Sequence, residues 1–224
     1  LQDAVTYAKQ RVQFGKPIAE FGLIKHKIAE MAIRTFAVES MVYRTAEMTD
    51  RILQRIDHHA EDVGIQMARG IEEYAIEDSI NKVYSSEMLD YIVDEALQIH
   101  GGYGYIHDYA IERGYRDSRI NRIWEGTNEI NRLLIMDMLT KRAMKNRLPV
   151  LAAAQKVANE LLSLRPKVES DDSKLTLQKE MVEMSKKIAL LVAGAAVQKY
   201  MMKLAEEQEI LASISDMVIE VFAM

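Results

Sequence analysis

Residues 23–56 read LIKHKIAEMAIRTFAVESMVYRTAEMTDRILQRI, and this stretch decides the fold class. Its small and apolar side chains recur on or near one stripe of an α-helix, the pattern of a helix that buries one face. About 34 residues at 1.5 Å each give a rod of roughly 50 Å. Helices of that length usually belong to a bundle. The stripe consists of Met31, Thr35, Val38, Val42, Thr45 and Met48.

Helical patterns continue on both sides of this stretch. The segment before it runs from Leu1 to about Phe14 and is stopped by Gly15-Lys16-Pro17, since a residue before proline is pushed out of the α region. The remaining expected helices cover residues 58–99, 110–119, a segment from the turn at 125–128 to about 145, then 150–164, 174–205 and 209–224. The prediction is an all-α fold, an up-and-down helical bundle with an additional C-terminal helical region.

The composition excludes several classes of protein. The 224 residues include 29 basic and 34 acidic side chains and carry a formal net charge of −5, so they lack the basic excess that nucleic-acid binding needs. The absence of cysteine excludes disulfides, Cys-ligated zinc and a Cys nucleophile. The 10 glycines and 3 prolines are few, which favours helices over a β-sandwich or barrel.

The histidine spacing gives no sign of a metal site. A di-iron helical bundle needs Glu-x-x-His on two helices, and none of the five histidines has glutamate three positions before it. No His-Glu-x-x-His zinc pattern occurs either. The sequence therefore predicts no metal ligands.

Two domains are expected, residues 1–146 and residues 147–224. Pro149, Pro166 and the polar segment 169–173 set the second region apart. No apolar run reaches the roughly 18–20 residues of a membrane span. The longest is Ile188–Val197, which we expect to be buried between helices. The chain starts without a signal-peptide pattern and ends in an apolar stretch, so we expect a piece of a longer protein whose second region is truncated.

The glycine cluster Gly101-Gly102-Tyr103-Gly104 allows two interpretations. A dinucleotide fingerprint needs a strand before the glycines, whereas here a helix precedes them. The local interpretation is a helix C-cap followed by a tight turn. A backbone contact with a ligand stays open, because a close approach also demands glycine.

The segment Trp124-Glu125-Gly126-Thr127-Asn128-Glu129 also has two interpretations. It could be an ordinary helix start, with Thr127 or Gly126 as N-cap and Glu125 in solvent. Alternatively, Glu125 lies in a turn beside an apolar tryptophan, where apolar surroundings would raise its pKa toward that of a useful base.

Four arginines recur every third residue, at positions 113, 116, 119 and 122. They could form a solvated face with Asp117 as partner, bind a phosphate-bearing ligand, or contact a partner subunit. Their spacing does not choose among these.

Several of these segments occur together in one order: Arg11-Val12-Gln13-Phe14-Gly15, then 98–105 (QIHGGYGY), 112–117 (ERGYRD) and 123–130 (IWEGTNEI). This order resembles the C-terminal helical domain of flavin-dependent acyl-CoA dehydrogenases over about residues 1–140. Residues 21–24 (FGLI) and 125–133 resemble the very-long-chain branch most, which also carries an extra helical region. In the family, an N-terminal helical domain and a middle β-domain precede this one, and both are absent from this chain.

The resemblance implies a reaction and its base. Glu125 would abstract the α-proton of a long-chain fatty acyl-CoA while the β-hydrogen leaves as hydride to flavin, giving trans-2-enoyl-CoA in β-oxidation. Trp124, which replaces the more usual Tyr or Phe, and Gly126 would lie at the substrate. The isolated piece is expected to be inactive, because in the family the two missing domains form most of the walls of the flavin and substrate sites.

The resemblance also implies FAD as cofactor. Its contacts would come from Arg11, Gln13, Phe14, Gln98, Gly101, Gly102, Thr127 and Glu129. Glu129 stands where many members have Gln. Several of these residues reach the neighbouring subunit's cofactor in the family, so a homodimer or a dimer of dimers is implied, with an electron-transfer flavoprotein as acceptor.

Rival functions are an acyl-CoA oxidase, which passes the electrons to oxygen, and a non-catalytic assembly partner with the same fold. The expected location is the bacterial cytoplasm or the mitochondrial matrix, without secretion. In residues 147–224 we predict no catalytic motif, and we expect the methionines to be core. A peripheral membrane contact is a second interpretation of this region. These methionines are Met181, Met184, Met201 and Met202.

Overall fold

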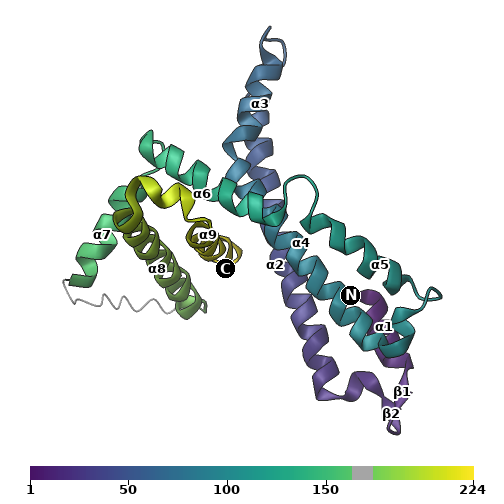
Figure 1. The fold of residues 1–224 in the computed structure, drawn as a ribbon. Helices are drawn as coiled ribbons and strands as arrows, with labels where there is room; N and C mark the ends of the chain where they lie inside the picture. The colour runs from purple at the N-terminus through teal and green to yellow at the C-terminus, as the bar shows by residue number, and fades with distance from the viewer. Residues whose placement is uncertain (163–173) are drawn as a thin grey trace. The chain divides into compact units, whose positions relative to one another are not determined.

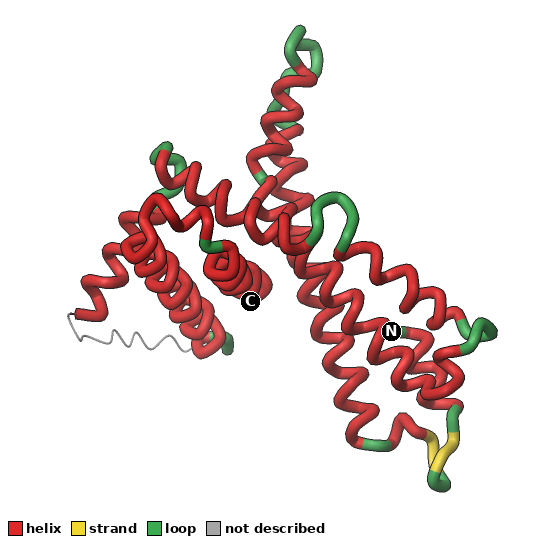
Figure 2. The backbone as a smooth tube through the Cα atoms, in the orientation of Figure 1, coloured by secondary structure: helices red, strands yellow, loops and turns green. Residues whose placement is uncertain are grey.

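The structure is a computed structural model that describes residues 1–162 and 174–224. The predicted all-α fold is confirmed: the described chain is almost entirely helical, with one short two-stranded hairpin (Figures 1 and 2). The chain divides into two compact units, Leu1–Asn128 and Glu129–Met224. The predicted domain boundary at residue 146 stays a prediction.

The first unit is arranged around two long helices, α2 and α4, which lie side by side (Figure 1). The predicted rod is α2, and it ends at Leu53, three residues before the expected end. The unit contains α1 (Gln2–Gln10), β1 (Val12–Gln13), β2 (Lys16–Pro17), η1 (Ile18–Glu20), α2 (Gly22–Leu53), α3 (Val63–Glu73), α4 (Ala75–His100), η2 (Gly101–Tyr105), α5 (Ala110–Ser118) and η3 (Arg119–Arg122).

Small residues let α1 pack closely against α2 and α4. Ala4 and Ala8 are fully buried with Met31 of α2 and with Ala96 and Ile99 of α4. Close packing of this kind is sensitive to even one added methylene. The first unit therefore fixes the end of α1 relative to the end of α4, where the candidate cofactor residues lie.

The predicted stripe of α2 is largely correct. Met31 and Thr45 are buried, and Asn81 Nδ2 of α4 donates to Thr45 Oγ1 at 2.8 Å, which satisfies a polar group inside the packing. Val42 is exposed, whereas its neighbour Met41 is buried. The reason is geometric: a helix with 3.6 residues per turn rotates its buried face along a rod of this length.

Two predicted segments differ from the structure. The expected helix 58–99 is divided at Tyr74 into α3 and α4. The helix expected to reach Phe14 ends at Gln10, and a β-hairpin follows, pairing Val12 with Pro17 across the residues Phe14 and Gly15. Both turn residues have positive φ, 53° and 82°, as a two-residue type I′ turn requires.

The second unit comprises α6 (Asn128–Met144) from Glu129 onward, α7 (Val150–Leu162), α8 (Thr176–Tyr200), η4 (Met201–Glu206) and α9 (Gln208–Ala223). Met136, Ala196, Leu204 and Ile214 form its core. Arg132 Nε of α6 donates to Asp216 Oδ1 of α9 at 2.6 Å. Gly194 of α8 faces α7, where a Cβ would lie 3.4 Å from the Ala154 Cβ, an ordinary van der Waals contact.

The predictions for α8 need correction. Met181, Met184 and Met201 are exposed rather than core, and within the run Ile188–Val197 only Ala189 and Ala196 are buried. The fully buried positions of this run are the small residues, whereas Ile188, Val192 and Val197 are exposed. The side chain of Met202, like Pro166 and the polar segment 169–173, lies outside the described residues. Among those residues, no helix combines the length and apolar character that crossing a membrane needs.

Candidate functional site

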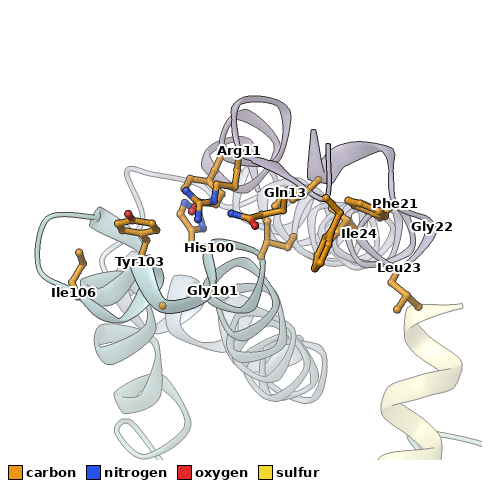
Figure 3. Close-up of a pocket in the computed structure, with 15 residues that line it drawn as sticks. Arg11, Gln13, Phe21, Gly22, Leu23, Ile24, His100, Gly101, Tyr103 and Ile106 are labelled. Atoms are coloured by element: carbon orange, nitrogen blue, oxygen red, sulfur yellow. The ribbon is translucent and has the colours of Figure 1, made fainter. Parts of the chain in front are cut away.

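A cavity of about 860 Å³ lies in the first unit, between the end of α1, the hairpin, the start of α2 and the end of α4 with η2 (Figure 3). Five of the eight predicted cofactor residues line it: Arg11, Gln13, Phe14, Gly101 and Gly102. Packing therefore brings together two segments that are almost ninety positions apart in the sequence. The role assigned to these residues stays a prediction.

Arg11 reaches the cavity because it follows the last turn of α1. Its backbone N–H donates to the Tyr7 carbonyl at 2.8 Å. The guanidinium lies 5.2 Å from the centre of the Tyr103 ring, a cation–π arrangement (Figure 3). The cavity thus holds one cation with several N–H donors against an aromatic surface.

Two aromatic side chains that line the cavity, Tyr7 and His100, were not predicted from the sequence. Tyr7 stacks on the buried His100 with ring centres 4.2 Å apart, and His100 Nδ1 lies 2.7 Å from the Ala96 carbonyl. Burial raises the pKa of the Tyr7 hydroxyl, while Arg11 acts in the opposite direction. Tyr7 is one helical turn before Arg11, and His100 directly precedes the glycines. These positions next to the motif residues could have identified both as cavity residues.

The glycine cluster is a helix C-cap, as the local interpretation predicts, and also part of the cavity wall. Gly101 ends α4 with φ of 58°, and its N–H donates to the Gln98 carbonyl. A Cβ at Gly101 or Gly102 would meet open space, whereas one at Gly104 would lie 2.7 Å from the Leu97 carbonyl. Gly104 therefore serves packing. Gly101 and Gly102 both leave open space at the cavity that they line, and the positive φ of Gly101 also favours glycine. Gln98 does not line the cavity.

The other predicted residues lie on the turn before α6 or, for Glu129, in its first turn, and none of them lines the cavity. Glu125 and Gly126 both have positive φ, 51° and 80°. The Glu125 side chain is exposed and Trp124 is 55% exposed, so this chain alone does not supply the apolar surroundings that the sequence suggested. Thr127 is half-buried, and Glu129 is an exposed residue of the second unit.

A polar network from α4 holds this turn. Lys82 Nζ donates to the Gly126 carbonyl at 2.6 Å and to Asn128 Oδ1 at 2.7 Å. Asn128, 3% exposed, donates through Nδ2 to Ser86 Oγ and to Glu87 Oε1, each at 3.0 Å. Sequence reasoning did not single out Lys82, because nothing in its helical context marks it.

Two of the four regularly spaced arginines pair with acids of the first unit. Arg116 donates to the buried Glu112 at 2.8 Å, and Arg122 lies 3.1 Å from Asp90. One of the interpretations left open for these arginines named Asp117 as partner, whereas the hydrogen bond of Arg116 goes to Glu112. The hydrogen bond from Arg116, with His107 nearby, holds the pKa of Glu112 below its usual range. In residues 1–162 and 174–224, no group of three or more His, Cys, Asp and Glu side chains is placed to hold a metal.

Comparison with known proteins identifies the family. A family model described as "Acyl-CoA dehydrogenase, C-terminal domain" matches residues 1–140, and another of the same description matches residues 184–224. A probable acyl-CoA dehydrogenase of Bacillus subtilis is 50% identical over 223 residues, which are 99% of this chain and 37% of that protein. A mitochondrial very long-chain specific acyl-CoA dehydrogenase of Macaca fascicularis is 39% identical over 132 residues, 59% of this chain and 17% of that protein.

A solved structure shows the same fold over nearly the whole chain. An acyl-CoA dehydrogenase from Bacillus anthracis, crystallised in complex with FAD, superposes with a TM-score of 0.95 at 51% identity, covering 98% of this chain and 37% of that one. This chain thus spans 37% of the length of each Bacillus protein. The helical bundle, the order of the motifs and the match over residues 1–140 agree: the chain belongs to the acyl-CoA dehydrogenase family.

Proposed function

We propose that the protein containing this chain is an FAD-dependent dehydrogenase that converts a fatty acyl-CoA to the trans-2-enoyl-CoA. The observation that carries the proposal is the convergence of Arg11, Gln13, Phe14, Gly101 and Gly102 on one cavity of a chain in this family. A relative crystallised with FAD superposes on 98% of the present chain.

The chemistry of the cavity fits FAD. A pyrophosphate needs N–H donors and positive charge, which the Arg11 guanidinium supplies in a planar fork. An adenine or flavin ring needs flat apolar surface, which Tyr103 and the exposed ring of Phe14 provide. The open space beside Gly101 and Gly102 admits a bulky group close to the backbone. When bound, FAD supplies the acceptor for the hydride equivalent that leaves the substrate.

Glu125 is the proposed general base. The α-hydrogen of a thioester is weakly acidic, so the reaction needs a carboxylate held against that carbon. The turn presents the Glu125 carboxylate away from the packing of the first unit, where it is exposed. The remaining domains of the whole protein would then cover it and exclude water. Trp124 and Gly126 flank the base and are the proposed contacts near the thioester.

Gln98, Thr127 and Glu129 complete the proposed cofactor contacts, some of them toward a second subunit. The proposed substrate is long-chain and the proposed pathway is β-oxidation. The electron acceptor would be an electron-transfer flavoprotein, and the assembly a homodimer or a dimer of dimers. The proposed location is the bacterial cytoplasm or the mitochondrial matrix, because relatives come from Bacillus and from mitochondria.

The test uses the whole protein, purified with its flavin and kept anaerobic. A long-chain acyl-CoA is added, the visible flavin spectrum is recorded, and the thioester product is identified by mass spectrometry. We expect bleaching of the flavin and loss of two hydrogens from the acyl chain. Bound flavin that no acyl-CoA of any length reduces would contradict the proposal. Rapid oxygen consumption in air would identify an oxidase instead.

A further inference from the structure

The Glu125 turn has a backbone that needs external support. Glu125 and Gly126 follow one another in left-handed conformations, and for a residue with a Cβ such a conformation costs about 1 kcal/mol or more unless its surroundings impose it. A glutamate at φ of 51° is therefore held by something outside itself. The side chain is exposed, so packing of Glu125 does not provide that support.

The support comes from α4. Lys82 and Ser86 are four residues apart and thus on one face of this helix. The Lys82 ammonium donates to the Gly126 carbonyl, directly after Glu125, and to the Asn128 side chain, the first residue of α6. One cation therefore binds both ends of the tripeptide 126–128 that follows Glu125.

The Asn128 amide can take only one orientation in this network. Its oxygen faces the Lys82 ammonium, and its nitrogen donates to Ser86 and to the Glu87 carboxylate. A flipped amide would place an NH₂ group against the ammonium and an oxygen against the carboxylate. Both N–H groups and the oxygen of this 3%-exposed side chain have partners of the right polarity, so the network specifies one orientation of the amide.

We propose that Lys82 is a positioning residue for the base: its two hydrogen bonds, to the Gly126 carbonyl and to Asn128, fix the left-handed turn and so aim the Glu125 carboxylate. The proposal rests on the proposed function, since it assigns Lys82 to the same site. Support from a rigid helix is what a precisely placed catalytic group requires. Lys82 acts through the backbone of the turn and need not touch the substrate.

The experiment compares the whole, flavin-loaded protein with its Lys82→Met, Lys82→Arg and Glu125→Gln variants, and with Lys25→Met as the control for loss of an exposed charge. Three quantities are measured: the anaerobic rate of flavin reduction, exchange of the α-hydrogens of the acyl-CoA with D₂O by mass spectrometry, and affinity for a non-reducible acyl-CoA thioether. Flavin content and thermal stability are recorded for each variant.

Lys82→Met should slow flavin reduction and α-hydrogen exchange together, on the order of 10- to 100-fold, because a displacement of about 1 Å has that effect. Flavin content and thioether affinity should stay as in the wild type. Lys82→Arg, which retains a donor, should recover much of the rate, and Lys25→Met should not differ from the wild type. If Lys82→Met does not fold, Lys82→Gln takes its place. Its uncharged and shorter side chain cannot serve both acceptors, so both rates should fall below those of Lys82→Arg, and wild-type rates in Lys82→Gln would overturn the proposal.

Two results would overturn the proposal. One is a Lys82→Met protein that exchanges and reduces at the wild-type rate. The other is a rate per bound flavin that is unchanged while flavin content falls, which would show a structural role alone. Glu125→Gln separates this from a failure of the proposed function: if it too reacts like the wild type, Glu125 is not the base and the function must be revised.

Discussion

The cavity at the end of α1 and the turn that carries Glu125 solve different physical problems in one helical unit. In the cavity, residues from α1, the hairpin, α2, α4 and η2 converge, and two of them, Phe14 and Gly101, have left-handed backbone. At the turn, a glutamate itself is left-handed and its side chain is exposed. A cavity lined by several elements suits the binding of a cofactor. A strained turn supported by one helix suits the presentation of a single carboxylate, that of Glu125.

This difference assigns separate roles to the two regions. The cavity is largely formed by the first unit alone, so its variants should change cofactor affinity. The turn offers a carboxylate that the rest of the protein must enclose, so its variants should change the rate of the chemical step. All predictions refer to the whole, flavin-loaded protein.

The largest effect is expected at the turn. Glu125→Gln should lower the rate of anaerobic flavin reduction by about 10²- to 10⁴-fold, the usual contribution of general base catalysis. Flavin content should be unchanged because Glu125 does not line the cavity. Stopped-flow absorbance measures the rate, and Glu39→Gln on the exposed part of α2 is the matched control. A wild-type rate of flavin reduction in Glu125→Gln would contradict the assignment of the chemical step to the turn.

The next effect is expected at the cavity. Arg11→Met should weaken FAD affinity about 10- to 100-fold, because hydrogen bonds to a charged group contribute about 1.5–3 kcal/mol. Lys9→Met, which removes a charge from the exposed side of the same helical turn, is the control. Equilibrium dialysis of the apoprotein against FAD gives both affinities. Equal affinities for the two variants would mean that Arg11 acts only through general charge.

A backbone effect should follow at Gly101. Gly101→Ala should destabilise the protein by about 1–3 kcal/mol, the cost of a strained left-handed position, although a Cβ would meet no atom there. Gly102→Ala has equal space and no positive φ, so it should cost less. Chemical denaturation of the two variants measures this difference. Equal losses would contradict the conformational explanation for glycine at position 101.

The smallest effect is expected on the pH dependence of stability at Glu112, which lies outside both the cavity and the turn. The pKa of Glu112 is lowered in the folded state, so its stabilising contribution is present above the unfolded value of about 4.3 and is lost as the pH falls through the lower folded value. Glu112→Gln should therefore flatten the decline of thermal stability below about pH 4.3. Because the side chain of Arg116 is 72% exposed, solvent screens the pair and the change should be small. A steeper acid decline in Glu112→Gln would contradict the sign.

Much of the fold could be predicted because helical periodicity depends on local sequence. The stripe of α2 follows directly from it, and the starts of α6 and α7 follow from the turn at 125–128 and from Pro149. The break at Tyr74 and the hairpin at Phe14-Gly15 could not be predicted, since tertiary packing and an uncommon positive φ at phenylalanine decide them. The exposed methionines of α8 escaped prediction for a similar reason, because the small residues Ala189 and Ala196 make the helix contacts.

The candidate site could be predicted only as separate motifs. Arg11 and Gly101 were both identified, but the sequence gives no distance between them, and only the packing of α1 against α4 shows that they share a cavity. Lys82 escaped prediction because its role depends on where the turn at Gly126 lies in space. Such long-range polar contacts leave no periodic pattern.

The most direct test of the separate roles compares Arg11→Met and Glu125→Gln in the same anaerobic experiment. Each variant is measured for bound flavin, then supplied with saturating FAD and mixed with a long-chain acyl-CoA. Arg11→Met should lose flavin on purification but, once loaded, bleach at close to the wild-type rate. Glu125→Gln should keep its flavin and fail to bleach. If both variants lose flavin, or both bleach equally once loaded, the cavity and the turn do not have the separate roles assigned to them.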